Sequence, residues 1–283
     1  MDRESGFERH GHEEPASPVI LSVPHAGRDY PLALRAALRV PLAYAVSLED
    51  RHADTLALAA RGAETLLIQR KARAWIDLNR AEHERDPRLD DGAGAATQPG
   101  LSAKVRSGLG LVPRRARGAD LWTRRLDASD VAARIAADHR PYHAALAEAL
   151  RRARARFGVA VLLDVHSMPS LPPKTGGAHI VFGDRFGRSA AARFVHRLEG
   201  EAAAAGLRHA LNTPYAGGHI LDRHGQPGNA IHAVQIEFDR ALYLDSRRDA
   251  PGPGLAPLAR LLRRMINAVA DEALAQSLPL AAE

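Results

Sequence analysis

Histidine, carboxylate and arginine side chains follow several of the apolar runs in this sequence. His25 comes just after VILSV (19–23), and His166 follows VAVLLDV (159–165). Two histidines and a carboxylate have the composition of a catalytic zinc site, in which three protein ligands leave one position for water. A further carboxylate can act as general base on that water. The chain offers several acids near predicted strand ends or at the start of a predicted helix: Glu49, Asp50, Asp54, Asp77, Asp164, Glu237 and Asp239.

Glu237 and Arg80 are suited to act on a substrate. Glu237 lies in the apolar run AVQIEFDR (233–240), and burial there would raise its pKa towards the range of a general base. Arg80 follows RAWIDL (73–78) and can form a bidentate pair with a substrate carboxylate. We therefore expect both side chains at a common site.

Each of these residues also has an ordinary structural interpretation. His25 can cap a turn, and His166 can bond a neighbouring backbone carbonyl. Asp164 can orient His166 or be an ordinary strand-end acid. Glu237 can face water from an edge strand, and Arg80 can neutralise Asp77. Because all of these explanations would be needed at once, at the ends of separate strands, the pattern favours a functional site.

Strands and helices alternate along the chain and would position these residues. We expect strands at 19–23, 65–69, 73–78, 159–165, 179–184 and 233–240. We expect helices at 49–61, 128–157, 188–206 and about 254–276, with a kink at Pro141. Such alternation predicts an α/β protein with a mixed, mostly parallel sheet covered by helices. In open α/β sheets, ligands collect outside the carboxyl ends of the strands.

The domain organisation follows from these elements. Residues 1–18 are polar and charged, and we expect them to form a flexible leader. Residues 19–283 are expected to form a single domain. Residues 82–125 are polar at first and rich in Gly, Asp and Pro, and they have no clear periodicity. A segment of this length inside a compact domain is usually functional or disordered, so we expect a partly ordered loop that covers a site.

Composition excludes several classes of protein. The 283 residues include no cysteine, which excludes disulfides and thiol nucleophiles and agrees with a reducing compartment. No apolar run reaches the roughly 20 residues that span a bilayer, and the N-terminus has no apolar segment of a secretory signal. We therefore expect a cytoplasmic protein without a membrane partner. The sequence does not indicate an oligomeric state.

The net charge of +6 makes nucleic-acid binding an alternative. The arginines are scattered, and many lie on predicted Ala/Arg helices, so we interpret most of them as solvated helix faces and expect no nucleic-acid partner. A positive field can also attract a small anionic substrate. The nucleotide-binding glycine motifs, the G-x-S-x-G elbow and the H-E-x-x-H motif are absent.

Taken together, the motifs resemble the N-formylglutamate amidohydrolase family. The matching segments occur in the family's order and span about 220 residues: LSVPHAG (21–27), LEDRHAD (48–54), WIDLNRAE (75–82), GLGLVP (108–113), HRPYHAAL (139–146), LLDVHSMPS (162–170), LNTPYAGGHI (211–220) and AVQIEFDRALYLD (233–245). The family is similar to zinc carboxypeptidases and aspartoacylases. The resemblance implies a three-layer α/β/α fold.

The resemblance also implies one zinc ion and its ligands. His25 and His166 match the family's histidine ligands, and Asp50 matches the acid assigned as the third ligand. Glu49 is the competing candidate for that position. In the carboxypeptidase branch the third ligand lies three residues after the first histidine, where this chain has Arg28.

The remaining site residues are implied in the same way. Asn79 and Arg80 match the DLNR motif that binds substrate, Glu237 matches the general base, and Gly217 and Gly218 are expected to shape the pocket. The implied reaction hydrolyses an N-acyl amino acid, with N-formyl-L-glutamate as the leading substrate, in histidine degradation. A related amidase with another acyl or peptide substrate, or a silent ligand binder, is the alternative. The chain departs from the family pattern at Ala216 and at Leu221–Arg223.

Overall fold

The structure, a computed structural model, describes residues 6–94, 100–173 and 176–275. The chain divides into two compact units, each assembled from segments that are far apart in the sequence. Unit 1 comprises Met1–Glu8, Pro24–Glu49 and Ile68–Ala145. Unit 2 comprises Arg9–Val23, Asp50–Leu67 and Leu146–Glu283. Both lie largely within the range 19–283 that the sequence predicts as one domain.

A seven-stranded mixed sheet is the framework of unit 2, to which each strand belongs wholly or in part. Its strand order is β1-β3-β2-β6-β9-β7-β8. The strands are β1 (Phe7–His10), β3 (Thr65–Gln69), β2 (Val19–Val23), β6 (Ala160–Met168), β9 (Ile231–Asp239), β7 (Ile180–Gly183) and β8 (His209–Leu211). β2, β6 and β9 pair in parallel, as do β7 and β8, whereas β7 and β9 are antiparallel. The predicted mixed, mostly parallel sheet is confirmed.

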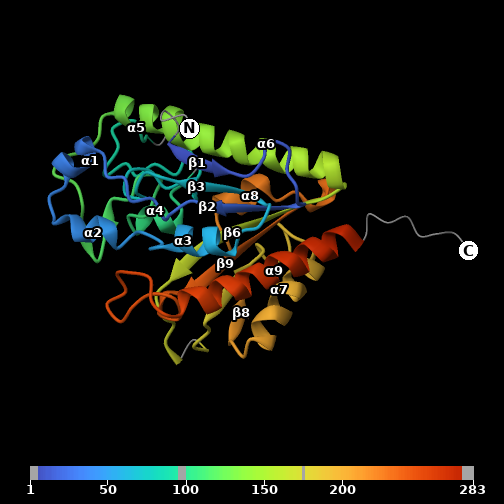
Figure 1. Ribbon diagram of the computed structural model, residues 1–283. Coiled ribbons are helices and arrows are strands. Elements are labelled where there is room, and N and C mark those ends of the chain that lie inside the picture. The colour runs from blue at the N-terminus through green and yellow to red at the C-terminus, as the bar shows by residue number, and fades with distance from the viewer. Residues whose placement is uncertain (1–5, 95–99, 174–175, 276–283) are drawn as a thin grey trace, which may run out of the picture. The chain divides into compact units, whose positions relative to one another are not determined.

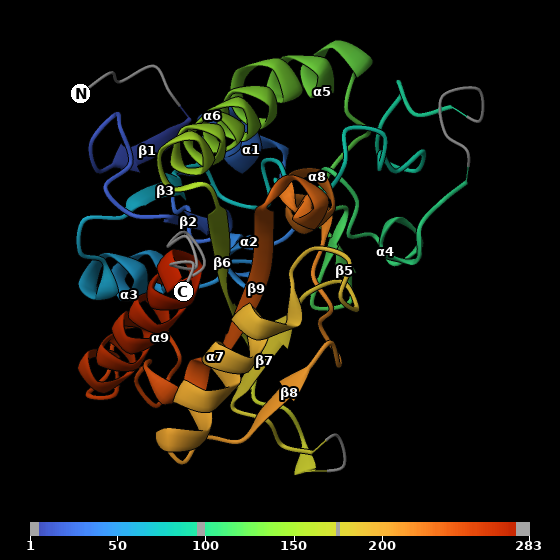
Figure 2. The same cartoon turned by 90° about the vertical axis from the view of Figure 1, so that its right-hand side faces the viewer.

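Helices cover both faces of this sheet (Figures 1 and 2). One face carries α3 (Ala53–Ala60), α7 (Ala192–Ala204) and α9 (Leu255–Ala275). The other carries α8 (His219–His224) and the part of α6 (Arg140–Phe157) that belongs to unit 2. These three layers confirm the predicted α/β/α arrangement.

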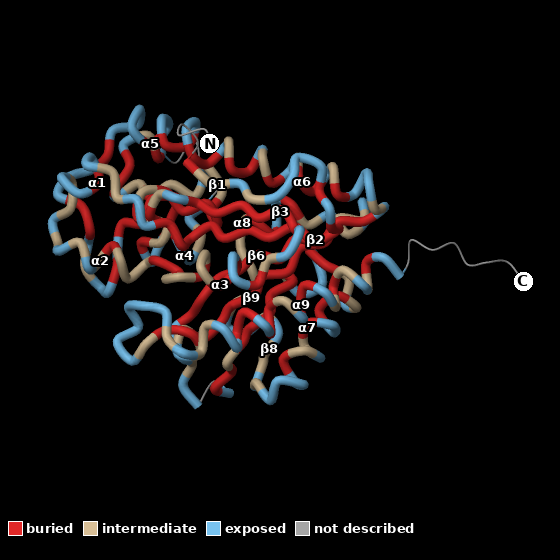
Figure 3. The backbone as a smooth tube through the Cα atoms, in the orientation of Figure 1, coloured by how far each residue is buried: buried red, intermediate tan, exposed pale blue. Residues whose placement is uncertain are grey.

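The central strands are buried on both sides, as Figure 3 shows for β6 and β9. Their apolar residues, such as Leu163 and Ile236, have no exposed surface, which is typical of parallel strands covered by helices. α9 contributes Leu262, Met265 and Val269 from a single buried helix face. Polar residues inside these strands are therefore costly unless they are hydrogen-bonded.

Unit 1 contains short elements and long turns. Its short helices include α1 (Leu32–Ala37), α2 (Leu42–Val46), α4 (Ala103–Arg106) and α5 (Ala128–Arg134), and β4 (Arg115–Ala116) pairs with β5 (Ala119–Asp120). Three of these elements, α4, β4 and β5, lie in the segment 82–125 that the sequence predicts as a partly ordered loop. Residues 95–99 of that segment lie outside the described residues.

The predicted strand at 73–78 is wrong, because this segment consists of turns. Trp75 N donates to Ala72 O at 2.8 Å, and Asp77 N donates to Leu111 O at 2.7 Å. Ala74 and Ile76 are nevertheless fully buried. The apolar residues of this run therefore reflect a buried turn segment and not a strand of the sheet.

Two helix predictions change in detail. The stretch 128–157 is helical throughout, but Ile135–His139 form a π-helical segment between α5 and α6. It directly precedes the region of Pro141, whose ring nitrogen cannot donate a helical hydrogen bond. The helix expected at 49–61 begins only at Ala53, because His52 has the left-handed backbone angle φ 58°.

The termini add two observations. Phe7–His10, within the expected leader, form β1. Among the described residues, none of the helices has the length and apolar character needed to cross a membrane.

Candidate active site

Polar side chains occupy one face of the central strands of unit 2. In the parallel ladder, His166 on β6 lies opposite Glu237 on β9, and Asp164 lies opposite both Ser22 on β2 and Gln235 on β9. Because strand side chains alternate between faces, residues two positions apart point the same way. The sheet thus gathers five buried polar residues on one face of an otherwise apolar core.

His166 is held between two carboxylates. Its Nδ1 lies 2.9 Å from Asp50 Oδ2, and its Nε2 lies 2.7 Å from Asp164 Oδ2. Asp164 also accepts a hydrogen bond from Ser22 Oγ at 2.7 Å. Burial disfavours the imidazolium, but the charges and hydrogen bonds of Asp164 and Asp50, with the charge of Glu237, raise the pKa of His166 well above its usual range. The site therefore favours a positive charge at this position.

Asp50 reaches His166 from the turn that precedes α3. Ala53 N donates to Asp50 O at 3.0 Å, and His52, in the left-handed conformation, lies between these two residues. The turn places the Asp50 carboxylate in the buried interior. Glu49, the competing candidate, belongs to unit 1, where its carboxylate accepts a hydrogen bond from the Tyr30 hydroxyl.

Arg240 binds the same carboxylate, and the sequence did not single it out. Its guanidinium donates to Asp50 Oδ1 at 3.3 Å, to Ser167 Oγ at 3.0 Å and to Ser167 O at 3.4 Å. Arg240 directly follows the strand that carries Glu237. Its place as the last residue of the predicted strand 233–240 was the signal that would have identified it.

Glu237 is buried and has a neighbouring amide donor. Gln235 Nε2 donates to Glu237 Oε1 at 3.0 Å, and only 8% of Glu237 is exposed. Sequence reasoning missed Gln235 and Ser22. Both are single polar residues inside apolar strands, and because such residues need partners when buried, this pattern could have identified them.

In unit 1, Asp77 organises the segment that contains the other predicted residues. Its Oδ1 lies 2.7 Å from His25 Nε2 and accepts a hydrogen bond from Asn79 N at 2.8 Å, while Arg73 Nε donates to Oδ2 at 2.9 Å. Burial opposes ionisation, but the charges of Arg73, His25 and Arg80 hold the pKa of Asp77 well below its usual range. Asp77 is thus an ionised anchor for His25, a role that the sequence did not reveal.

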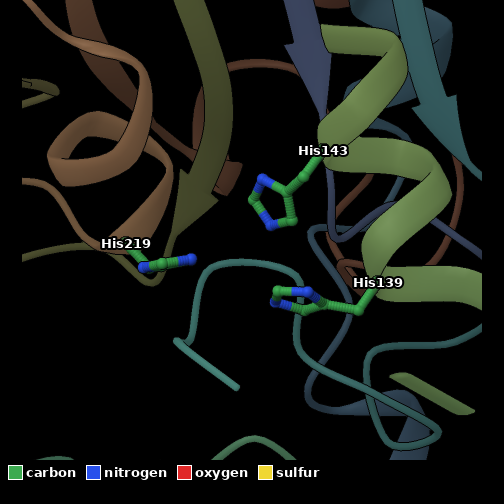
Figure 4. A group of neighbouring side chains, drawn as sticks. All are labelled: His139, His143 and His219. Carbon is green, nitrogen blue, oxygen red and sulfur yellow. The ribbon is translucent and has the colours of Figure 1, made fainter. Parts of the chain in front are cut away.

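Two histidines support the backbone just after Asp77. His139 Nε2 lies 2.8 Å from Arg80 O, and His143 Nε2 lies 3.0 Å from Leu78 O. Figure 4 shows these two rings side by side on the helix, with centroids 4.4 Å apart. The Arg80 guanidinium donates to Leu109 O at 2.9 Å and Asn79 O at 2.6 Å. These bonds use two of its five N–H donors.

Gly217 and Gly218 lie in the loop before α8 in unit 2. Gly217 has φ +100°, in the region that favours glycine, and a Cβ there would lie 2.4 Å from a Leu221 methyl carbon. The preceding Ala216 backbone packs against Gly183 of β7, where a Cβ would approach Ala216 C to 2.7 Å. Gly183 thus permits a close approach of two backbone segments, whereas Gly217 provides a left-handed turn that leaves no room for a side chain.

The donor set suits a divalent metal. Imidazole nitrogen and carboxylate oxygen are common zinc ligands, and buried His/Asp side chains that include Asp50 and His166 could hold a metal ion, with ligand atoms within 4.8 Å of one another. Metal-binding histidines usually bond a carboxylate or carbonyl through the other ring nitrogen. His166 does so with Asp164, and His25 has the same kind of bond with Asp77.

Comparisons with known proteins agree on one family. A family model described as N-formylglutamate amidohydrolase matches residues 17–244. N-formylglutamate deformylase of Pseudomonas aeruginosa PAO1 is 31% identical over 268 residues, covering 91% of this chain and 93% of that protein. The enzyme of the same name from Pseudomonas putida is 31% identical over 266 residues, covering 88% and 92%.

Solved structures give the same relationship. The crystal structure of N-formylglutamate amidohydrolase from Ralstonia eutropha JMP134 is similar with a TM-score of 0.87 and 31% identity, covering 96% of this chain and 99% of that one. A protein from Agrobacterium tumefaciens has a TM-score of 0.68 at 19% identity, covering 96% of each chain, and shares the fold.

Proposed function

Because the chain belongs to the N-formylglutamate amidohydrolase family, we propose that it hydrolyses N-formyl-L-glutamate to formate and L-glutamate. One observation carries the proposal. Each of the two predicted histidine ligands is bonded through Nε2 to a buried carboxylate at 2.7 Å, His25 to Asp77 and His166 to Asp164. Such a pairing fixes the ring, so that Nδ1 would be the nitrogen that holds a metal. The expected place in histidine degradation, and in the cytoplasm, is part of the same proposal.

We assign one zinc ion to His25, Asp50 and His166. The chain path supports the inclusion of His25. Only Pro24 separates His25 from Val23 at the end of β2, so their Cα atoms lie no more than about 7.6 Å apart. β2 runs beside β6 in parallel, with Ser22 level with Asp164, and two residues further along β6 is His166. When bound, zinc supplies Lewis acidity that polarises a carbonyl and lowers the pKa of water.

Glu237 is the proposed general base. In the register of the sheet it is the direct neighbour of His166, and Gln235 restrains its carboxylate. It takes a proton from the attacking water as the water oxygen bonds to the formyl carbon. It then gives that proton to the amide nitrogen as the C–N bond breaks, which yields formate and the free amino group.

Asn79 and Arg80 are proposed to bind the substrate. Asp77 and the Leu109 carbonyl fix their backbone and guanidinium positions, and the three N–H donors of Arg80 not used in these bonds suit a carboxylate. A preset guanidinium loses little freedom on binding. The Gly217–Gly218 loop is proposed to shape the pocket, and Arg240 is proposed to orient the Asp50 carboxylate through its hydrogen bond.

A substrate panel tests this proposal. Formate or acyl release would be followed for N-formyl-L-glutamate, N-acetyl-L-glutamate and N-formyl-L-methionine. The measurements would be made before metal removal, after it, and after zinc is restored. We expect the highest kcat/KM for N-formyl-L-glutamate, loss of activity on removal and recovery with zinc. A preference for another acyl amino acid would favour the related-amidase alternative. No turnover of any substrate by zinc-loaded protein would contradict hydrolysis.

A further inference from the structure

A cavity of about 230 Å³ in unit 1 is lined mainly by arginine side chains. It lies apart from Asp77, Asn79 and Arg80 in the sequence and contains none of them. Five guanidinium groups face it, together with two apolar side chains and one carboxylate. The lining residues are Arg39, Arg88, Leu89, Arg114, Asp120, Trp122, Arg124 and Arg125.

The positive charge of this cavity is only partly neutralised. Arg114 is paired with Asp86 at 2.8 Å and with Asp120 at 2.5 Å, and Arg125 with Asp91 at 2.8 Å. Within the described ranges 6–94, 100–173 and 176–275, neither Arg39 nor Arg88 has an ion pair with a carboxylate.

The fifth arginine of the lining, Arg124, adds to this excess. Arg124 has a single long contact of 3.5 Å to Asp127, between side chains that are 68% and 58% exposed. Such an exposed pair contributes little. The cavity therefore presents at least two guanidinium groups, those of Arg39 and Arg88, that can bind a ligand. They lie with Arg114, whose guanidinium is already oriented by two carboxylates.

The floor of the cavity is firmly built. Trp122 and Leu89 are buried, and Trp122 Nε1 donates to Pro113 O at 2.8 Å. Arg114 is itself buried and is oriented by carboxylates on two sides. Backbone bonds from Arg39 N to Leu121 O and from Leu126 N to Leu89 O tie the walls together at 2.8 Å and 2.7 Å. A fixed arginine fork loses less freedom when it binds an oxyanion than a flexible one does.

Most of the lining comes from the segment 82–125, which lacks periodicity in the sequence and has no part in the proposed reaction apart from the Leu109 carbonyl. Its two ends meet at this cavity, Arg88 and Leu89 from one end and Trp122 to Arg125 from the other. A long irregular segment that folds around a charged cavity is typical of a binding loop.

We propose that this cavity binds a small multivalent oxyanion, of the phosphate or diphosphate class. Guanidinium forks match the oxygen geometry of phosphate in a bidentate manner. The cavity is smaller than the 300–1,000 Å³ of a typical pocket for drug-sized ligands, which favours one or two phosphate groups. A monovalent carboxylate would leave most of the guanidinium charge unmatched. The assignment is independent of the proposed hydrolysis.

Calorimetric titration with pyrophosphate and with inorganic phosphate tests the site, at constant ionic strength in chloride buffer. The full-length protein would be compared with an Arg39→Gln/Arg88→Gln double variant. The control is Arg35→Gln/Arg154→Gln, which removes the same charge from two exposed arginines outside the cavity. Each titration would be repeated after metal removal, since phosphate also binds metal ions. Acetate and a single-stranded oligonucleotide would be titrated in the same way as comparison ligands.

We expect saturable 1:1 binding of pyrophosphate that survives metal removal. The cavity variant should bind at least about tenfold more weakly, because two charge-assisted contacts are lost, and the control variant should be unchanged. Equal weakening in both variants would contradict the site and indicate a general charge effect. Absence of saturation, equally strong acetate binding, dependence on the metal, or binding of the oligonucleotide alone would each overturn the assignment.

Discussion

Nε2 of His166 lies 2.7 Å from Oδ2 of Asp164, two residues earlier on the same strand. Because β6 is buried along its whole length, this carboxylate has no role as a solvated surface charge. It fixes the imidazole ring and leaves Nδ1 directed towards Asp50. Four of the five predictions below follow from the proposed metal site that this pair supports.

Asp164→Asn should weaken zinc binding by about 10–100-fold, the usual effect of removing the carboxylate partner of a histidine ligand. A competition titration with a chromogenic chelator would measure the affinity. Asp239→Asn is a matched control, because Asp239 is also a buried aspartate of the sheet but accepts hydrogen bonds from Ser170 Oγ and Ala241 N. Equal zinc affinity in wild type and Asp164→Asn would contradict the assigned role.

Asp77→Asn should weaken zinc binding to a similar degree through His25, if His25 is a ligand as proposed. The amide can no longer stabilise the Nε2–H tautomer as a charge does. Arg73→Gln is the control, since it removes another partner of Asp77 but keeps the carboxylate. An Asp77→Asn protein that binds zinc like wild type would exclude His25 as a ligand positioned in this way.

Glu237→Gln should reduce kcat by about 10²–10⁴-fold, the typical contribution of a general base. The amide keeps the size of the side chain but cannot accept the proton. Zinc content, measured by elemental analysis, should remain at one equivalent, and KM for N-formyl-L-glutamate should change little. A variant with kcat within twofold of wild type would show that another group takes the proton.

Glu64 and Arg263 give a stability prediction that is separate from the site. Arg263 Nη1 and Nη2 bond the two Glu64 oxygens at 2.8 and 2.7 Å. Burial raises the pKa of Glu64, but the Arg263 bonds and the backbone bonds outweigh it and lower the pKa below 4.5. A carboxyl group whose pKa is lower in the folded than in the unfolded protein stabilises the fold at pH values above its unfolded-state pKa. This contribution is lost as the pH falls through the folded-state pKa.

Glu64→Gln should therefore lower the free energy of unfolding at pH 7 by about 1.5–3 kcal/mol, the usual range for a hydrogen bond to a charged group. The difference from wild type should shrink once the pH falls below about 4.5. Urea unfolding followed at several pH values would measure it. A difference that stays constant from pH 7 to pH 3 would contradict the linkage.

The sequence predicted the strands of the sheet correctly where an apolar run is a strand buried on both faces. The runs at 19–23 and 233–240 became β2 and β9 because their residues are buried on both faces. It failed at 73–78, where Ala74 and Ile76 are buried as in a strand but the backbone turns. Periodicity reports which side chains are buried, and it cannot distinguish a strand from a buried extended turn.

The sequence identified several residues of the candidate site, but it did not reveal which of them contact one another. His166 and Glu237 were identified from their places in apolar strands, but their adjacency depends on the β6–β9 register, which pairs residues 71 positions apart. The bonds from Asp77 to His25 and from Arg240 to Asp50 also join distant segments. Local patterns carry no information on such pairings, so these roles required the structure.

The most direct test of the account is the zinc content and turnover of an Asp50→Ala/His166→Ala double variant, compared with Glu49→Ala. Elemental analysis and formate release from N-formyl-L-glutamate would be measured on the same samples, with circular dichroism to establish folding. We predict that the double variant is folded, binds no zinc and has no measurable kcat, whereas Glu49→Ala retains its zinc. Full activity in the folded double variant would contradict the proposed metal site and the mechanism built on it.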